Sequence, residues 1–479
     1  MEYKQNGEFI RCEWRPDIYT DTGADYSLPD YNGDVRKILF TSADVRPSGS
    51  FENSDSVDFS GIVVYNMVYS DSENKINSVS FTSDYDFSVK CDGQSNVGSS
   101  ADISVSNYSM RLLGPRKISA KATLASRVAL AKVENQQLGG TAFDDGALPE
   151  VECVRVDVAS VGMSETLERE YAEELIRLDG EGADDVNIVC SDAECVIESV
   201  SAEDGGVSLK GNMRIYALVK CGDEPMFLAE KSLKIDESLV FENMKRGGKI
   251  SPAVTVSSVR CTVSSDENGC SVVANVIADL SAKTYGNERV ELTTDAYRRD
   301  RETQNNYGDY RYLEICTLIA EKEDFNESVD REGLEVDNLR EVICLSAEAK
   351  VESAGVEDDV ARMVGEIRYN GIACGVDETG NLSYHPFKIS LPFVKNVNLN
   401  CQNYEKIRLT PSVVCVSAGA TVDENKVYLS CLSHFEVLVC EERCVKVLTE
   451  SNVVGDVEIQ DEGRRLPFII PRSRKRFLI

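Results

Sequence analysis

The chain has 479 residues, of which 42% are hydrophobic and 7% aromatic, and its formal charge is -31. This length and hydrophobic content favour buried cores divided among about three domains. The acidic excess disfavours nucleic acid and anionic lipid as general partners, and it favours a basic or cationic partner.

The longest apolar runs are short, such as residues 62–65 and 391–394. They fall far short of the ~20 residues that a membrane-spanning helix needs. Residues 1–17 carry charge throughout and contain no apolar stretch of the kind found in a secretory signal. We therefore expect a cytoplasmic protein with no transmembrane span.

Short segments rich in Val, Ile, Ser and Thr recur along the chain and predict a mainly antiparallel β protein. Turn sequences separate them at residues 266–269, 377–380 and 423–425. Apolar and polar residues alternate at 207–210 and 254–256. Such alternation indicates sheets with one buried face and one exposed face.

Three stretches of the chain follow one plan, in which the middle strand contains a glycine followed closely by a tyrosine. The strands are 35–45, 57–69 and 76–89, then 186–200, 207–219 and 227–241, then 339–351, 361–373 and 384–394. The pairs are Gly61 with Tyr65, Gly211 with Tyr216 after one extra residue, and Gly365 with Tyr369. The glycines are 150 and 154 positions apart. Further alternating strands follow at 116–122, 270–276 and 426–432.

These patterns predict a mainly β fold of three tandem, sandwich-like repeat units with minor helical connectors. A helix is expected at residues 164–178, because Leu167, Tyr171, Leu175 and Leu178 would form one stripe on it. A second acidic helical connector is expected at 321–338.

The expected division of the chain follows from these units. It comprises an N-terminal segment (1–30), the first unit (31–135), an acidic connector with a helix (136–183), the second unit (184–300), an acidic connector (301–338), the third unit (339–455) and a basic, hydrophobic tail (456–479).

Several short motifs connect these units to a known family. They are Lys37-Ile38-Leu39, the glycine–tyrosine strands, Pro392-Phe393 and Thr294-Asp295-Ala296-Tyr297. In these features, over most of its length, the chain resembles the SPOCS-domain family of clostridial sporulation proteins. In that family an Asp-Ala-Tyr sequence closes a unit, which the resemblance assigns here to Asp295 and Tyr297.

The resemblance implies a non-enzymatic scaffold that helps to assemble or anchor the spore coat. It would act in the mother-cell cytoplasm, at the forespore surface or in the coat, with other coat or morphogenetic proteins or a second copy of the chain as partners. SipL-like members of the family end in a LysM module that contacts the coat ATPase. This chain instead ends in EGRRLPFIIPRSRKRFLI, without a LysM-like pattern.

Sequence motifs for catalysis or cofactor binding are weak. The two histidines, His385 and His434, lie in strand-like runs, and no serine lies in a Gly-x-Ser-x-Gly elbow. Residues 247–250 lack the spacing of a phosphate-binding loop, and the Asp-rich segments 143–146 and 179–185 lack the ligand order of an EF-hand. We expect no enzyme activity, no cofactor and no metal.

Sixteen cysteines are spread from Cys12 to Cys444, and no two are spaced like the ligands of a zinc knuckle. Three interpretations remain open: buried thiols packed in strands, later oxidative crosslinks, and a metal site.

The tail carries one basic cluster, Arg472, Arg474, Lys475 and Arg476, followed by Phe477. These are the candidate contacts with a partner or, weakly, with an anionic membrane surface; the alternative is a solvated terminus. Deleting residues 464–479 is expected to leave the fold intact and to weaken localisation.

Two functions outside catalysis are consistent with the sequence. Repeated β units favour a scaffold, because similar faces on one chain bind several partners at once. The alternative is a module that binds cell-wall or coat polysaccharide. That alternative is weakened by the single tryptophan, Trp14, because sugars usually stack on aromatic rings.

Overall fold

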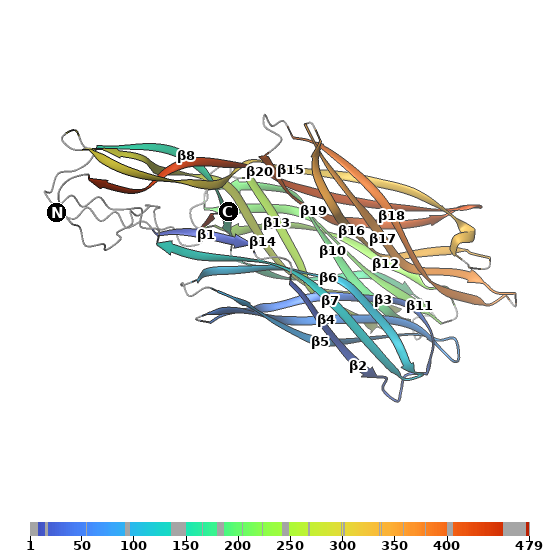
Figure 1. Ribbon diagram of the computed structural model, residues 1–479. Coiled ribbons are helices and arrows are strands. Elements are labelled where there is room, and N and C mark those ends of the chain that lie inside the picture. The colour runs from blue at the N-terminus through green and yellow to red at the C-terminus, as the bar shows by residue number, and fades with distance from the viewer. Residues whose placement is uncertain are drawn as a thin grey trace.

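A computed structural model shows long antiparallel strands throughout the described part of the chain (Figure 1). The described residues are 8–14, 18–53, 55–91, 96–135, 150–164, 166–179, 186–203, 205–222, 224–241, 249–266, 269–297, 299, 302–334, 336, 338–357, 359–378, 380–399, 406–453 and 476–478. The predicted β class is confirmed. The longest helical element in these ranges is the four-residue 3-10 turn η2 (Arg331–Leu334), and no helix in them is long and apolar enough to cross a bilayer.

Each of three regions forms a sandwich in which a three-stranded sheet packs against a second layer of three paired strands. The second layers of the first two regions are parts of one nine-stranded sheet. One layer is a meander of three consecutive strands. The meanders are β3 (Val35–Glu52), β4 (Ser56–Asp71) and β5 (Ile76–Lys90); β10 (Val186–Glu203), β11 (Gly206–Cys221) and β12 (Phe227–Val240); and β16 (Glu341–Glu357), β17 (Val360–Val376) and β18 (Leu382–Asn398).

The second layer of each sandwich has the last strand of the region at its centre. On one side this strand pairs with the strand that precedes the meander, and on the other side it pairs with the strand that follows the meander. These layers are β2 (Ile18–Ser27), β7 (Lys117–Asn135) and β6 (Asn96–Gly114); β9 (Leu167–Asp179), β14 (Gly269–Tyr297) and β13 (Lys249–Asp266); and β15 (Thr303–Asp330), β20 (Lys426–Val453) and β19 (Ile407–Val422). All three sandwiches therefore have the same strand order. Figure 1 shows the first in blue and cyan and the third in yellow to red.

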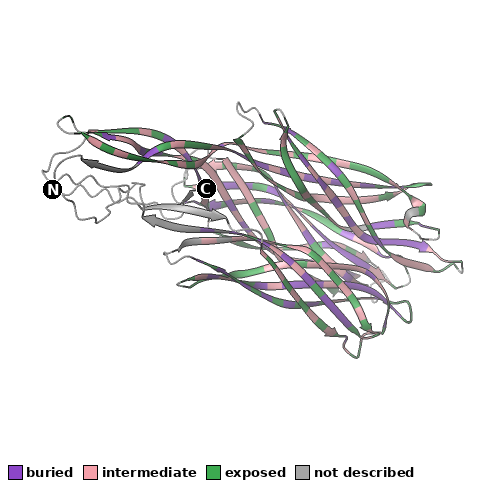
Figure 2. Ribbon diagram, in the orientation of Figure 1, coloured by how far each residue is buried: buried purple, intermediate pink, exposed green. Residues whose placement is uncertain are grey.

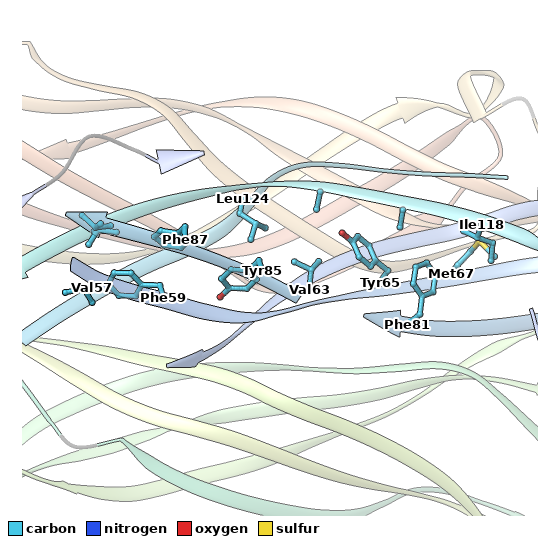
Figure 3. Packing of buried hydrophobic residues seen from close by; sticks show 14 of the residues in the cluster. Val57, Phe59, Val63, Tyr65, Met67, Phe81, Tyr85, Phe87, Ile118 and Leu124 are labelled. Atoms are coloured by element: carbon cyan, nitrogen blue, oxygen red, sulfur yellow. The ribbon is translucent and has the colours of Figure 1, made fainter. Parts of the chain in front are cut away.

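Each sandwich has its own apolar core between its layers. Buried and exposed residues alternate along most of β5. Figure 2 shows how buried, intermediate and exposed residues are distributed along the strands. In the first core Tyr65 stacks on Phe81 with ring centres 5.5 Å apart, and neighbouring apolar side chains fill the layer (Figure 3). The third core holds three aromatic rings with centres 5.5 to 6.1 Å apart: Phe325, Phe393 and Phe435.

Several strands continue beyond the sandwiches as arms, seen at the left of Figure 1. The end of β14 pairs with β8 (Glu150–Met163), the start of β15 pairs with the end of β20, and β1 (Glu8–Trp14) pairs with the end of β7. The short strand β21 (Arg476–Leu478) lies between β1 and β8. The arms of the second and third sandwiches pack through one apolar cluster: Val156, Val158, Val290, Leu292 and Val447.

A glycine lies at one place in the middle strand of each meander, opposite a β-bulge. The three are Gly61 in β4, Gly211 in β11 and Gly365 in β17. A Cβ atom on any of them would collide with a carbonyl oxygen of the bulged strand, that of Arg46, Val196 or Lys350. Because a carbonyl held in a strand ladder cannot move aside cheaply, each bulge requires glycine.

The residue four positions after each glycine belongs to the core. Tyr65 and Tyr369 occupy this place in the first and third sandwiches. In the second sandwich the place belongs to Ile215, so the pairing of Gly211 with Tyr216 is wrong by one residue. Successive residues of a strand point to opposite faces, and Tyr216 faces the central cavity described below.

The two predicted helical connectors are mostly strand, so that prediction is wrong. Residues 167–179 form β9, residues 321–330 belong to β15, and only residues 331–334 of the second connector are helical, in the turn η2. Leu167, Tyr171 and Leu175 all pack in the second core. They are four residues apart, and a spacing of four puts side chains on one face of a strand as well as of a helix.

The predicted turns at 377–380 and 423–425 are confirmed, since they join β17 to β18 and β19 to β20. In the first of them the Gly380 amide donates to the Asp377 carbonyl at 3.0 Å, and Gly380 has a φ of 86°. A positive φ of this size favours glycine, because other residues are strained there.

Candidate functional site

The three meanders face one another in the middle of the molecule around a cavity of about 1170 Å³. Strands β3 to β6, β10, β11, β13 and β16 to β19 line it, so every sandwich contributes to the wall. The wall carries acidic, basic and thiol side chains. A polar chamber therefore lies between three apolar cores.

One apolar cluster joins the three meanders next to this cavity. It consists of Leu39, Val68, Ile76, Val189, Leu218, Met226, Ile343 and Ile372. Val68, Leu218 and Ile372 each come seven residues after the bulge glycine of their meander. Leu39, Val189 and Ile343 each come 22 residues before it. Corresponding positions of the three meanders thus meet at one junction.

The same correspondence puts one acidic residue of each sandwich on the cavity wall. Asp44, Glu194 and Glu348 each come 17 residues before the bulge glycine. Each directly follows an alanine that pairs with the core residue four positions after the glycine. Burial raises the pKa of all three carboxyl groups.

Glu194 has a cationic partner across the strand pair. It lies opposite Arg214, whose Nη1 donates to Glu194 Oε2 at 3.3 Å and whose Nη2 donates to Glu230 Oε2 at 2.6 Å. The guanidinium carbon also lies 5.1 Å from the centre of the Tyr216 ring. Burial raises the pKa of Glu194, and the charge of Arg214 partly opposes that rise.

The other two acids differ in this respect. Glu348 lies opposite Arg368, whereas Asp44 lies opposite Val64. Asp44 accepts a hydrogen bond from the Ser42 hydroxyl at 3.3 Å. Burial raises the pKa of Asp44, and the hydrogen bond from Ser42 and the charge of Arg46 partly oppose that rise.

Asp192 adds a fourth carboxyl group to the wall, beside Asp44 and Glu194. Desolvation in the recessed cavity wall and, after it, the charge of Asp44 together raise its pKa to about 7. The Ala193 amide donates to Asp192 Oδ1 at 2.8 Å. The side chain opens onto the cavity and is reached by solvent.

Three thiols of the second sandwich also line the wall, those of Cys190, Cys195 and Cys261. Burial raises the pKa of Cys190 and of Cys195 to about 12. These thiols stay protonated at neutral pH, and a protonated thiol is a poor nucleophile. Within the described ranges, no three His, Cys, Asp or Glu side chains converge as metal ligands would.

Asp295 and Tyr297 are not among the residues that line the cavity; they lie at the end of β14, in the second arm. The Asp295 carboxylate accepts hydrogen bonds from Asn305 Nδ2 at 2.5 Å and from the Tyr307 hydroxyl at 3.0 Å. Tyr297 hydrogen-bonds Glu150 of β8. This segment therefore connects the second arm to the third.

Of the predicted tail contacts, Arg472, Arg474 and Lys475 lie outside the described residues. Arg476 and Phe477 lie in β21, where their backbones pair with Gly162 and Val161 of β8.

The four cavity acids were not predicted from the sequence. Asp44, Glu194 and Glu348 come from strands about 150 residues apart, and their common offset is revealed only when all three glycines are placed in register. No protein-family model matches the sequence, and no curated protein is detectably similar to it.

Proposed function

We propose that the chain is a non-enzymatic scaffold of endospore formation, which helps to assemble or anchor the coat at the forespore surface. Its three sandwiches would be copies of one SPOCS-like unit. The observation that carries this proposal is the common strand order of the three sandwiches and their meeting at corresponding positions. A chain of this design presents similar outer faces in several directions.

Similar faces on one rigid body suit assembly. A partner that binds one face weakly binds two faces of one molecule much more tightly, because the second contact is intramolecular. The junction cluster supports this geometry, since it holds the three meanders in fixed relation through buried contacts. No single strong binding site is required.

The charge of the exposed strand faces favours basic partners. On β5 the outward positions include Asp84 and Asp86. On β12 they include Glu230 and Asp236, which also form ion pairs with Arg214 and Lys210. With a formal charge of -31 for the whole chain, these faces attract cationic surfaces and repel phosphate-rich ones. Basic coat proteins are therefore the proposed partners.

The chemistry of the cavity also supports a structural role. Burial raises the pKa of its carboxyl groups and thiols, which favours their neutral forms. An activated nucleophile needs the opposite shift or an adjacent base.

A fluorescent fusion expressed in a sporulating clostridium tests the proposal. The expected result is a ring of fluorescence around the forespore, with the fluorescent protein alone as the control. Uniform fluorescence in vegetative cells would contradict it. Retention of the purified chain on insoluble cell wall, without a forespore ring, would favour the polysaccharide-binding alternative.

The tail residues Arg472, Arg474, Lys475, Arg476 and Phe477 are proposed as a further contact with a partner or membrane surface. A fusion that lacks residues 464–479 is expected to give a weaker forespore ring at equal abundance. An unchanged ring would remove the tail from the proposal. A large fall in the midpoint of thermal unfolding would instead assign it to the fold, through the pairing of β21 with β1 and β8.

A further inference from the structure

Two cysteine sulfurs lie close together in the third sandwich. Cys415 Sγ and Cys431 Sγ are 3.3 Å apart, and the Ser433 hydroxyl lies 3.3 Å from the second sulfur. Both cysteines are free thiols. A disulfide requires about 2.05 Å between the sulfurs, so the pair needs only a small adjustment of the side chains to reach bonding distance.

The strands explain why the two thiols meet. Cys415 of β19 pairs with Ser433 of β20, and the register shifts between Cys415 and Ser417. This bulge leaves Cys415 diagonally across from Cys431, on the same face of the sheet, and both side chains pack in the third core. The surrounding strand ladder holds the two sulfurs in place.

We propose that Cys415 and Cys431 are a redox site, at which a peroxide oxidant forms a disulfide that staples β19 to β20. Cys431 is fully buried, whereas Cys415 is among the residues that line the central cavity. A small oxidant such as hydrogen peroxide therefore meets Cys415 first.

The reaction balances with one peroxide. The Cys415 thiol first loses its proton, and the thiolate sulfur attacks a peroxide oxygen. The O–O bond breaks, the departing hydroxide takes up the proton, and the products are a sulfenic acid and one water. The Cys431 sulfur then attacks the Cys415 sulfur, and the S–O bond breaks as the S–S bond forms. The hydroxyl leaves with the remaining thiol proton as a second water. The two thiols are oxidised and the peroxide is reduced.

The hydrogen bonding of the pair suits the second step. Either sulfur can donate its S–H to the other. With Cys415 as the donor, the contact lowers the pKa of Cys431 and raises the pKa of Cys415. The resolving sulfur therefore has the greater thiolate character, which is the reactive form in disulfide formation.

Peptide mapping of the full chain tests the proposal. The reduced protein is treated with hydrogen peroxide, blocked with an alkylating agent and digested with trypsin. Cleavage after Arg408, Lys426 and Arg443 releases Cys415 in the peptide 409–426, and Cys431 together with Cys440 in the peptide 427–443. The expected product is these two peptides joined, lighter than their sum by two hydrogen atoms.

Three variants identify the sulfurs. Cys415→Ala and Cys431→Ala should abolish the joined peptides, whereas Cys440→Ala should leave them. The same oxidation in strong denaturant should give disulfides between many different pairs of cysteines. The proposal is overturned if the alkylating agent still modifies both thiols after oxidation of the native chain, or if the disulfide forms through Cys440.

A stability measurement gives a second readout. Oxidation should raise the midpoint of thermal unfolding of the wild-type chain, and the rise should be absent in Cys415→Ala. An equal rise of the unfolding midpoint in the wild type and in Cys415→Ala would contradict a stabilising disulfide between β19 and β20.

Discussion

The two faces of each meander differ in chemistry. One face carries Tyr65, Ile215 or Tyr369 into a dry core, and the opposite face carries Asp44, Glu194 or Glu348 into the shared cavity. At the core positions all three residues are large and apolar. Across from the acids, the residues are as different as Val64, Arg214 and Arg368. Close packing restricts which residues the core-facing side can carry, whereas the open cavity allows different residues on the other side.

The largest loss of stability is expected from a substitution that leaves an empty space in a sandwich core. Phe435→Ala removes a ring that is 1% exposed and packs against Phe325 and Phe393. It should lower the free energy of unfolding by about 3–5 kcal/mol, measured by denaturant unfolding. Val414→Ala on the adjacent strand is the control, because Val414 is 56% exposed. Equal losses in the two variants would contradict the contrast between faces.

A smaller effect is expected at the bulges. Gly365→Ala places a Cβ against the Lys350 carbonyl and the Phe393 ring, and it should cost about 1–3 kcal/mol of stability because the backbone must shift. Gly355→Ala is the matched control, since a Cβ there meets nothing within 4 Å. If Gly365→Ala unfolds at the same denaturant concentration as the control, the bulge does not require glycine.

The cavity side predicts a dependence on pH. The pKa of Asp192 is raised to about 7 from its ordinary value of 3.8. The folded state therefore holds a proton that the unfolded state has lost between these values, and stability falls as pH rises from about 4 to about 7. Asp192→Asn removes this loss.

The effect of Asp192→Asn should be about 1 kcal/mol of added stability at pH 8, after allowance for solvent in the cavity. Below pH 4 the variant and wild type should unfold alike. Unfolding curves across this pH range measure the difference. A stability difference between the variant and the wild type that does not vary with pH would contradict the raised pKa of Asp192. Asp44, Glu194 and Arg46 face the same carboxyl group and contribute to its shift.

The smallest effect is expected on the arms. Arg155 Nε lies 2.9 Å from Glu291 Oε2, but both side chains are more than half exposed. Exposed ion pairs contribute about 0–1 kcal/mol, so Arg155→Ala should barely move the unfolding midpoint. A loss as large as that of Gly365→Ala would show that the arm, like the sandwich cores, depends on this contact.

Local patterns predicted the β class, the turns and the glycine–tyrosine pairs of the first and third sandwiches. They failed where one spacing fits two structures, as for Leu167, Tyr171 and Leu175 in β9. They failed in the second sandwich because Ile215 stands where a tyrosine was expected. The cavity could not be predicted from any one segment, because its walls come from three regions that meet only after folding.

The junction of the meanders joins parts of one chain, so it does not come apart when the protein is diluted. Three separate chains joined by the cluster around Leu39, Val189 and Ile343 would dissociate at low concentration. On one chain, each sandwich meets the others at an effective concentration of about millimolar, whatever the amount of protein in the cell. A single chain also frees each cavity wall to change by itself, so that valine and arginine stand at corresponding places. A ring of identical subunits would repeat one choice at every wall.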